Sequence, residues 1–308
     1  RTGCKLAVVD ETGKMLDVTA IYPHQPKNDI KGSKDVVTKL LKKFPIEIIA
    51  IGNGTASRET EQFIADILKE MNNDVAYVIV NEAGASVYSA SEVARAEFPD
   101  LQVEQRSAVS IARRLQDPLS ELVKIEPKAV GVGQYQHDVS QKQLTESLSF
   151  IVETAVNQVG VDVNTASSSL LQYVSGLSKT VAENIVNARS ESGKFTSRAQ
   201  LKKIPRLGAK TYEQAIGFLR IPGAKNPLDA TGIHPESYEA AKLILSKLGF
   251  TSKDLGSEAL VEAVNNVNRQ ELIDELQIGE YTLNDILDAF IAPLRDPRDV
   301  IDAPVLRS

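Results

Sequence analysis

The sequence predicts an α/β domain with a mixed sheet, followed by a second half that is almost wholly helical. Two observations support this division. Within residues 1–140, apolar segments of strand length alternate with stretches of helical periodicity. Between residues 164 and 290, apolar residues recur at helical spacing, and one helix–turn–helix unit occurs twice. We therefore expect no extended strand pair in this second range.

The composition is typical of a folded intracellular chain. The 308 residues are 42% hydrophobic, which is enough for real cores, and a chain of this length is expected to hold about one to three domains. The single Cys4 cannot form an internal disulfide, and no apolar run reaches the length of a membrane span. The three histidines lack zinc-site spacing. We expect a cytoplasmic monomer without cofactor or metal. The chain opens inside a strand without Met or signal peptide, so we also expect it to be a fragment of a longer protein.

The first 140 residues begin with two strands joined by a turn. Lys5–Asp10 and Met15–Tyr22 are the strands, and Glu11–Lys14 supplies the turn. Apolar residues at 36, 37, 40, 41 and 44 then mark a helix that ends at a proline. The following segments are a buried strand (46–51), a helix (57–71), a strand (75–80) and a helix (103–115). In this last helix Arg106, Arg113 and Arg114 are expected as exposed charges.

A glycine turn, Gly52–Thr55, connects the buried strand to the following helix. A turn of this kind can hold a phosphate at the helix N-terminus. This one is too short for a P-loop and lacks the lysine, so we do not expect a nucleotide site here.

The helix–turn–helix unit that occurs twice is the most informative part of the chain. The first copy turns at Ser175–Ser178, and the second turns at Pro205–Gly208. Each turn needs a residue that tolerates a positive φ, a role predicted for the glycines at 176 and 208. Backbone N–H groups at the start of the next helix lack internal partners and suit a phosphate. The candidate phosphate-binding residues are Gly176, Leu177, Ser178, Lys179, Arg206, Leu207, Gly208 and Lys210.

The charge distribution supports binding of a polyanion by this region. Residues 164–223 carry nine Lys or Arg and three Glu, a net charge of +6, whereas the whole chain has a net charge of −6. A basic region in an acidic chain is typical of nucleic-acid binding. Nothing in either turn reads base edges, so we expect binding that is independent of sequence. The alternative is an ordinary helical hairpin with solvated lysines.

The segments around the repeat are predicted as a connection and a further domain. Residues 141–163 form an amphipathic linking helix, and residues 224–295 form an acidic helical domain. His234, beside Pro235, is expected to cap or pack rather than to bind a metal. The end of the chain, 296–308, is predicted as a linker.

The repeated unit resembles the tandem helix-hairpin-helix domain, and its amino-acid sequence resembles one family in particular. Val174–Leu177, Ile204–Gly208 and Asn226–Tyr238 are similar to segments of the bacterial transcription accessory proteins of the Tex family. The resemblance implies a tandem helix-hairpin-helix domain at 164–223. It also implies that an OB-fold RNA-binding domain follows beyond the end of this chain.

The first part of the chain resembles the YqgF domain of the same family. The matching stretches are Arg1–Lys5, Ile51–Thr55, Val80–Ser89 and Gly131–Asp138. The YqgF domain is a member of the ribonuclease H and RuvC superfamily, so the resemblance implies a fold of that type at 1–140.

Nucleases of this superfamily hold two divalent metal ions with acidic residues from the first strand, the fourth strand and a late helix. The resemblance places Glu82 at the second position and Asp138 at the third. The first-strand Asp is implied just upstream of Arg1, and Asp10 lies at the wrong end of its strand to replace it. We therefore expect no complete metal site and no nuclease activity. Glu82 can also be a surface carboxylate at a helix start.

Three functions remain open. The first is a nucleic-acid-binding scaffold of a transcription accessory factor, whose hairpins bind DNA or RNA phosphates and whose candidate protein partner is the transcription machinery. The second is a metal-dependent nuclease that uses Glu82 and Asp138. The third is a protein-docking module that presents the acidic region. Magnesium-dependent cleavage separates the first two, and salt-sensitive binding separates the first from the third.

Overall fold

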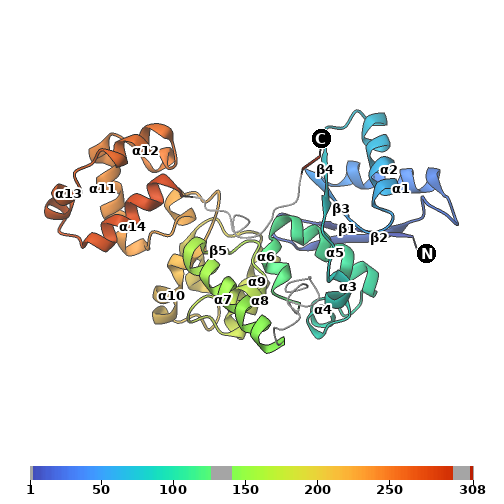
Figure 1. Cartoon of the computed structure of the whole chain (residues 1–308), viewed down its shortest axis with the longest axis horizontal. Coiled ribbons are helices and arrows are strands. Elements are labelled where there is room, and N and C mark those ends of the chain that lie inside the picture. The colour runs from blue at the N-terminus through green and yellow to red at the C-terminus, as the bar shows by residue number, and fades with distance from the viewer. Residues whose placement is uncertain (1–2, 126–140, 294–305, 308) are drawn as a thin grey trace. The chain divides into compact units, whose positions relative to one another are not determined.

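The computed structural model describes residues 3–125, 141–293 and 306–307, which fall into two compact units (Figure 1). The first unit comprises Arg1–Leu148 with Ile301–Ser308, and the second comprises Ser149–Val300. No helix in the described part of the chain is long and apolar enough to cross a membrane.

The first unit is an α/β domain whose strands and long helices lie near their predicted ranges. β1 (Cys4–Val9) and β2 (Met15–Ile21) form an antiparallel hairpin, and β3 (Ile48–Gly52) and β4 (Ala76–Val80) are parallel neighbours. The helices are α1 (Ile30–Lys43), α2 (Ser57–Glu70), α3 (Ala85–Ser89), α4 (Glu92–Glu97), α5 (Val103–Gln116) and α6 (Pro118–Leu122). The sequence pattern does not predict α4 and α6, because helices this short show no full apolar period. α3 lies just after Glu82, where a helix start is expected as the alternative role of that residue.

Side chains alternate across β3 and β4 and supply a core on each face. Ile51 packs with Ile67 of α2, whereas Val78 and Val80 pack with Ile111 of α5. The two helices therefore cover opposite faces of the strand pair, as the alternation of a strand requires.

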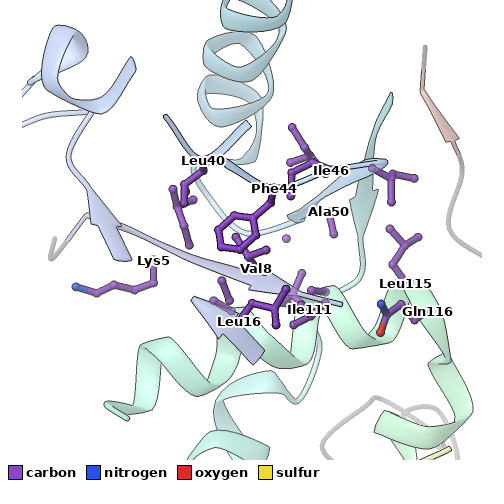
Figure 2. Close-up of a pocket in the computed structure, with 18 of the residues that line it drawn as sticks. Lys5, Val8, Leu16, Leu40, Phe44, Ile46, Ala50, Ile111, Leu115 and Gln116 are labelled. Carbon is purple, nitrogen blue, oxygen red and sulfur yellow. The ribbon is translucent and has the colours of Figure 1, made fainter. Parts of the chain in front are cut away.

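The predicted mixed sheet is present in divided form. β3, β4 and β7 (Leu306–Arg307, within the stretch predicted as a linker) form one mixed sheet, and β1 and β2 form a separate pair. A cleft of about 920 Å³ lies between β1 and β3, and it is lined by Leu40 of α1, by Phe44, which follows α1, and by Ile111 of α5 (Figure 2). Its lining is largely apolar. The edges of β1 and β3 that border the cleft pair with no other described strand.

The arginines of α5 are not exposed charges, which corrects the sequence-based expectation. Arg106 and Arg114 are 8% and 5% exposed and donate to backbone carbonyl oxygens. Arg113 pairs with Glu97 at 2.6 Å. A long guanidinium side chain can bend inward to satisfy carbonyl groups that helix ends and loops leave unpaired. These cations therefore do not offer a basic surface to a polyanion.

Glu97 is the centre of a partly buried ion cluster. Its carboxylate pairs with Arg113 and, at 2.9 Å, with Lys124, which also pairs with Glu121 at 2.8 Å. Burial tends to raise the pKa of Glu97, but Lys124 and Arg113 outweigh it, so the pKa lies below its usual value. The Tyr88 hydroxyl donates to the same carboxylate, and burial raises the pKa of Tyr88 well above its ordinary value.

Within residues 149–293, the second unit is helical apart from a two-residue strand pair, β5 (Val161–Asp162) with β6 (Leu219–Arg220), which agrees with the prediction. α7 (Gln141–Val159) leads into it. The repeated region contains α8 (Ser168–Leu171), α9 (Lys179–Ser192), the 3₁₀ helices η2 (Arg198–Lys203) and η3 (Ile216–Phe218), and α10 (Ala209–Ala215). The region after it contains η4 (Pro227–Ala230), η5 (Pro235–Ser237), η6 (Ser252–Asp254), α11 (Tyr238–Leu248), α12 (Glu258–Asn265), α13 (Arg269–Leu276) and α14 (Glu280–Ile291).

A buried arginine joins the repeated region to the region that follows it. Arg198, the first residue of η2, is 1% exposed. Its guanidinium donates to the carbonyl oxygens of Leu219, Thr231 and Ile233 and to the hydroxyl of Tyr238. A buried cation is tolerated when its donors are satisfied in this way.

Asp229 completes this network. Its carboxylate accepts from the backbone N–H of Arg198 at 3.0 Å and from the hydroxyl of Tyr238. Burial raises the pKa of Tyr238 despite the nearby guanidinium, and the bond to Asp229 raises it further. The hydroxyl therefore stays protonated and can donate to the carboxylate while it accepts from Arg198.

Lowering the pH is expected to destabilise the first unit through Glu97. Because its pKa is lower in the folded state, its stabilising contribution is present at neutral pH and is lost as the pH falls from about 4.5 through the folded-state pKa. Glu97→Gln should remove this part of the pH dependence and lower the free energy of unfolding at pH 7 by about 1–3 kcal/mol. Calorimetric unfolding at several pH values measures both effects.

The matched control is Glu70→Gln, which removes an ion pair with Lys34 from a carboxylate that is 61% exposed. It should change stability by less than about 1 kcal/mol. Identical pH dependence in the wild type and Glu97→Gln would contradict the role of Glu97.

Tyr238→Phe should destabilise the second unit. The change keeps the ring but removes the donor to one Asp229 carboxylate oxygen and one acceptor of the Arg198 guanidinium, at a cost of about 1–3 kcal/mol. Tyr281→Phe is the control, because Tyr281 is 89% exposed. Thermal unfolding of both variants measures the difference, and equal melting temperatures would show that the network does not stabilise the unit.

Candidate nucleic-acid interface

The two hairpins share one backbone design in a register of thirty residues. Ser167 and Ser197 cap the first helix of each copy, and Ser178 and Gly208 occupy the N-cap of the second. Buried residues recur in the same register: Leu171 with Leu201, Val174 with Ile204, and Leu177 with Leu207. The turn residues between these anchors are exposed in both copies. The repeat in sequence is therefore a repeat in structure.

The positive-φ position lies at Gly176 in the first copy and at Arg206 in the second, with φ of +87° and +66°. The prediction of this conformation at Gly208 is wrong, because Gly208 aligns with Ser178 and has φ of −73°. A Cβ at Gly208 would meet no atom within 4 Å. Arg206 instead holds a backbone conformation that costs an L residue about 1–2 kcal/mol.

The N-terminus of α9 presents backbone donors to solvent. The Ser178 hydroxyl accepts from the N–H of Val181 at 3.2 Å. The N–H groups of Lys179 and Thr180 have no acceptor in the described part of the chain, and both residues are exposed. Free donors at the positive end of a helix, next to a lysine, suit a phosphate.

Six of the nine basic residues at 164–223 are exposed. The other three are structural, since Arg189 and Arg198 are buried and Arg220 donates to a carbonyl oxygen of α7. The exposed six are Lys179, Lys194, Lys202, Lys203, Arg206 and Lys210. In the described part of the chain, Lys179, Arg206 and Lys210 form no ion pair. The net charge overstates the basic surface, but the cations at the turns are available to an anion.

Glu82, the candidate second metal ligand, lies beside the Gly52–Thr55 turn. A Cβ at Gly52 or Gly54 would lie 2.4 Å from one of its carboxylate oxygens, so the two glycines make room for this side chain. The Asn53 side chain accepts from the N–H of Glu82 at 3.1 Å. The turn therefore accommodates a carboxylate rather than a phosphate. Asp138, the other candidate, lies outside the described residues.

Among the described residues, the one group with three potential metal ligands within 4.8 Å of one another is Glu213, His234 and Glu236. The imidazole already has two partners, since Nδ1 accepts from the N–H of Glu236 at 3.2 Å and Nε2 lies 2.8 Å from the Glu213 carbonyl oxygen. This pattern assigns the proton to Nε2, so neither nitrogen offers a free lone pair to a metal. His234 caps η5, as the sequence predicts.

Comparison with known proteins identifies the family. The family model described as the Tex protein YqgF-like domain matches residues 1–116, a helix-hairpin-helix motif model matches 156–220, and an HHH domain model matches 226–298. The chain is 63% identical over 308 residues to the uncharacterized protein YdcI of Bacillus subtilis, covering 100% of this chain and 43% of that protein. It is 52% identical over 299 residues to the transcriptional accessory protein Tex of Neisseria gonorrhoeae, covering 97% of this chain and 39% of that protein. The chain belongs to the Tex family.

A more distant relative of this Tex-family chain is the S1 RNA-binding domain-containing protein 1 of Homo sapiens. The two are 39% identical over 348 residues, covering 94% of this chain and 35% of the human protein. The chain thus spans less than half of the length of each of these three relatives.

The third family match covers the region that the sequence pattern predicts only as an acidic helical domain. In this Tex-family chain the turn between α13 and α14 repeats the hairpin backbone, with φ of +55° at Gln277 and an N-cap at Gly279 with φ of −72°. The signal that could have revealed it is Ile278-Gly279, which matches Leu207-Gly208. The helix after this turn begins with Glu280, which disfavours a phosphate.

Arg206→Gly should strengthen the fold of the Tex-family chain and weaken its binding to polyanions. Glycine relieves the left-handed backbone, so the free energy of unfolding should rise by up to about 1 kcal/mol after the entropy of the unfolded state is counted. Loss of one cation should weaken binding to duplex DNA of any sequence roughly 3- to 10-fold at low salt. Thermal unfolding and fluorescence anisotropy measure the two effects.

Gln277→Gly is the matched control, because Gln277 has a similar φ but lies outside the basic region. It should raise stability without changing affinity. Unchanged affinity in Arg206→Gly would remove Arg206 from the interface.

Proposed function

We propose that this chain is a sequence-independent nucleic-acid-binding part of a transcription accessory factor. The observation that carries the proposal is the pair of hairpins with one backbone design, whose turns present Lys179, Arg206 and Lys210 without ion-pair partners in the described part of the chain. The free N–H groups at the start of α9 add donors for phosphate oxygens.

The chemistry of the turns favours the backbone of a nucleic acid over its bases. Phosphate oxygens accept from N–H groups and from cations, and both are present at the turn tips. Base recognition needs side chains that pair with base edges or aromatic rings that stack, and the exposed turn residues are serine, glycine, proline, lysine and arginine. DNA and RNA both satisfy this requirement.

A role in transcription is supported by the relatives. The Neisseria gonorrhoeae relative is named a transcriptional accessory protein, and the human relative is named for an S1 RNA-binding domain. We extend the first role to this chain and propose the transcription machinery as its protein partner.

The chain is proposed to bind nucleic acid without cutting it. Glu82 belongs to no group of three potential metal ligands among the described residues. Incubation of labelled duplex and single-stranded substrates with Mg²⁺ or Mn²⁺ should leave them intact. Reproducible cleavage that disappears in Glu82→Ala would establish the nuclease alternative instead.

Salt dependence tests the binding function. Each phosphate that a cation neutralises contributes about −0.9 to the log–log salt slope on duplex DNA, so two to four contacts predict a slope of roughly −2 to −4. Dissociation constants should lie around the non-specific range of 10⁻⁴–10⁻⁶ M at physiological salt. The double variant Lys179→Ala with Lys210→Ala should flatten the slope by up to about two units and weaken all sequences alike. Fluorescence anisotropy on two unrelated duplexes measures these quantities.

The control with the same loss of charge is Lys242→Ala with Lys253→Ala, two exposed lysines of the acidic region. Its slope should equal that of the wild type. An unchanged slope in the folded Lys179 and Lys210 variant, or an equal effect of the control, would place binding outside the hairpins.

A further inference from the structure

Each hairpin of the second unit is held by a side chain from the helix that follows the other hairpin. The Asn184 amide in α9 donates to the carbonyl oxygen of Pro205 in the second turn at 2.9 Å. The Gln214 amide in α10 donates to the hydroxyl of Ser175 in the first turn at 2.8 Å. Both the two donors and the two acceptors are thirty residues apart, so the bonds are equivalent under the repeat. Each hairpin thus accepts one hydrogen bond from the helix that follows the other hairpin.

The bridge at the first turn is also a packing contact. A Cβ at Gly176 would lie 3.1 Å from Oε1 of Gln214 and 3.4 Å from Cγ2 of Thr211. Gln214 therefore lies directly against the residue whose positive φ forms the turn. The position of this turn relative to α10 depends on that side chain.

These bridges are separate from the core below them. Leu177 and Leu207 are buried and anchor the turns, whereas Gln214 and Ser175 are exposed and Asn184 is half-buried. Removal of the amides should leave both hairpins folded, because each keeps its own apolar anchors. What changes is how firmly one turn tip is held with respect to the other.

We propose that Asn184 and Gln214 are positioning residues, which fix the two hairpins relative to each other so that both contact one nucleic-acid backbone at the same time. The inference rests on the proposed function and adds a requirement to it. Nucleic acid bound at one hairpin lies at a high effective concentration near the other, and this advantage exists only if the geometry is held.

Positioning and direct contact have different signatures in a salt titration. A loosened pair of hairpins still offers the same cations, so the number of released counterions and the slope stay constant while affinity falls at every salt concentration. Loss of a contacting cation changes the slope itself. The two roles can therefore be separated in one experiment.

The test uses the whole 308-residue chain and anisotropy on two unrelated duplexes across a range of salt. Gln214→Leu should weaken binding to both duplexes roughly 3- to 10-fold with an unchanged slope. Ser175→Ala removes the acceptor of the same bond and should have the same effect. The double variant should be no weaker than either single one, because both changes break one interaction. Asn184→Leu should behave in the same way at the second turn.

The control is Gln172→Leu, which removes an exposed amide that bonds only within its own helical turn, to Ser168. It should bind as the wild type does. Unchanged affinity in Gln214→Leu, or additive losses in the double variant, would overturn the positioning role and leave the proposed function standing. Salt-insensitive binding by the wild type would overturn both. If Gln214→Leu does not fold, as judged by circular dichroism, Ser175→Ala decides the outcome.

Discussion

Arg198 lies inside the second unit and donates hydrogen bonds to carbonyl groups from the end of the repeated region and from the start of the acidic region. A buried guanidinium is stable only while its donors are satisfied, so the surrounding backbone must keep its arrangement. The second hairpin begins in the same 3₁₀ helix, η2, and shares that constraint. From the sequence alone, Arg198 counts toward the basic surface. In the structure it is buried and supports the turn that carries this surface.

Under the proposed function, Arg206 sets binding against stability at the second turn. The first copy uses glycine at the positive-φ position, where the left-handed backbone carries no side-chain penalty, whereas the second copy holds an arginine there. The strained position places a guanidinium at the turn tip, beside the start of α10. Strain that persists in a backbone often serves a function, and under the proposed function the strain at Arg206 adds charge that glycine cannot supply.

The sequence predicts the main strands and long helices well, because their apolar periods are strong, and it predicts both hairpins from their repeated pattern. It does not distinguish buried arginines from exposed ones, since Arg106 and Arg206 look alike until the carbonyl groups around them are placed. It misplaces the positive φ at Gly208, because it assigns that conformation to the glycine of each turn, although the repeat aligns Arg206, not Gly208, with Gly176. Asn184 and Gln214 carry no motif, because their partners lie in the other hairpin.

Simultaneous contact of both hairpins with one backbone is tested most directly by backbone amide NMR. The whole chain would be titrated in turn with two duplexes of unrelated sequence. The predicted result is one set of shifted amides for both duplexes, centred on residues 176–180 and 206–211, with both turns titrating at the same dissociation constant. Shifts confined to the first unit or to residues 224–293, or a different set for each duplex, would contradict binding by the hairpins.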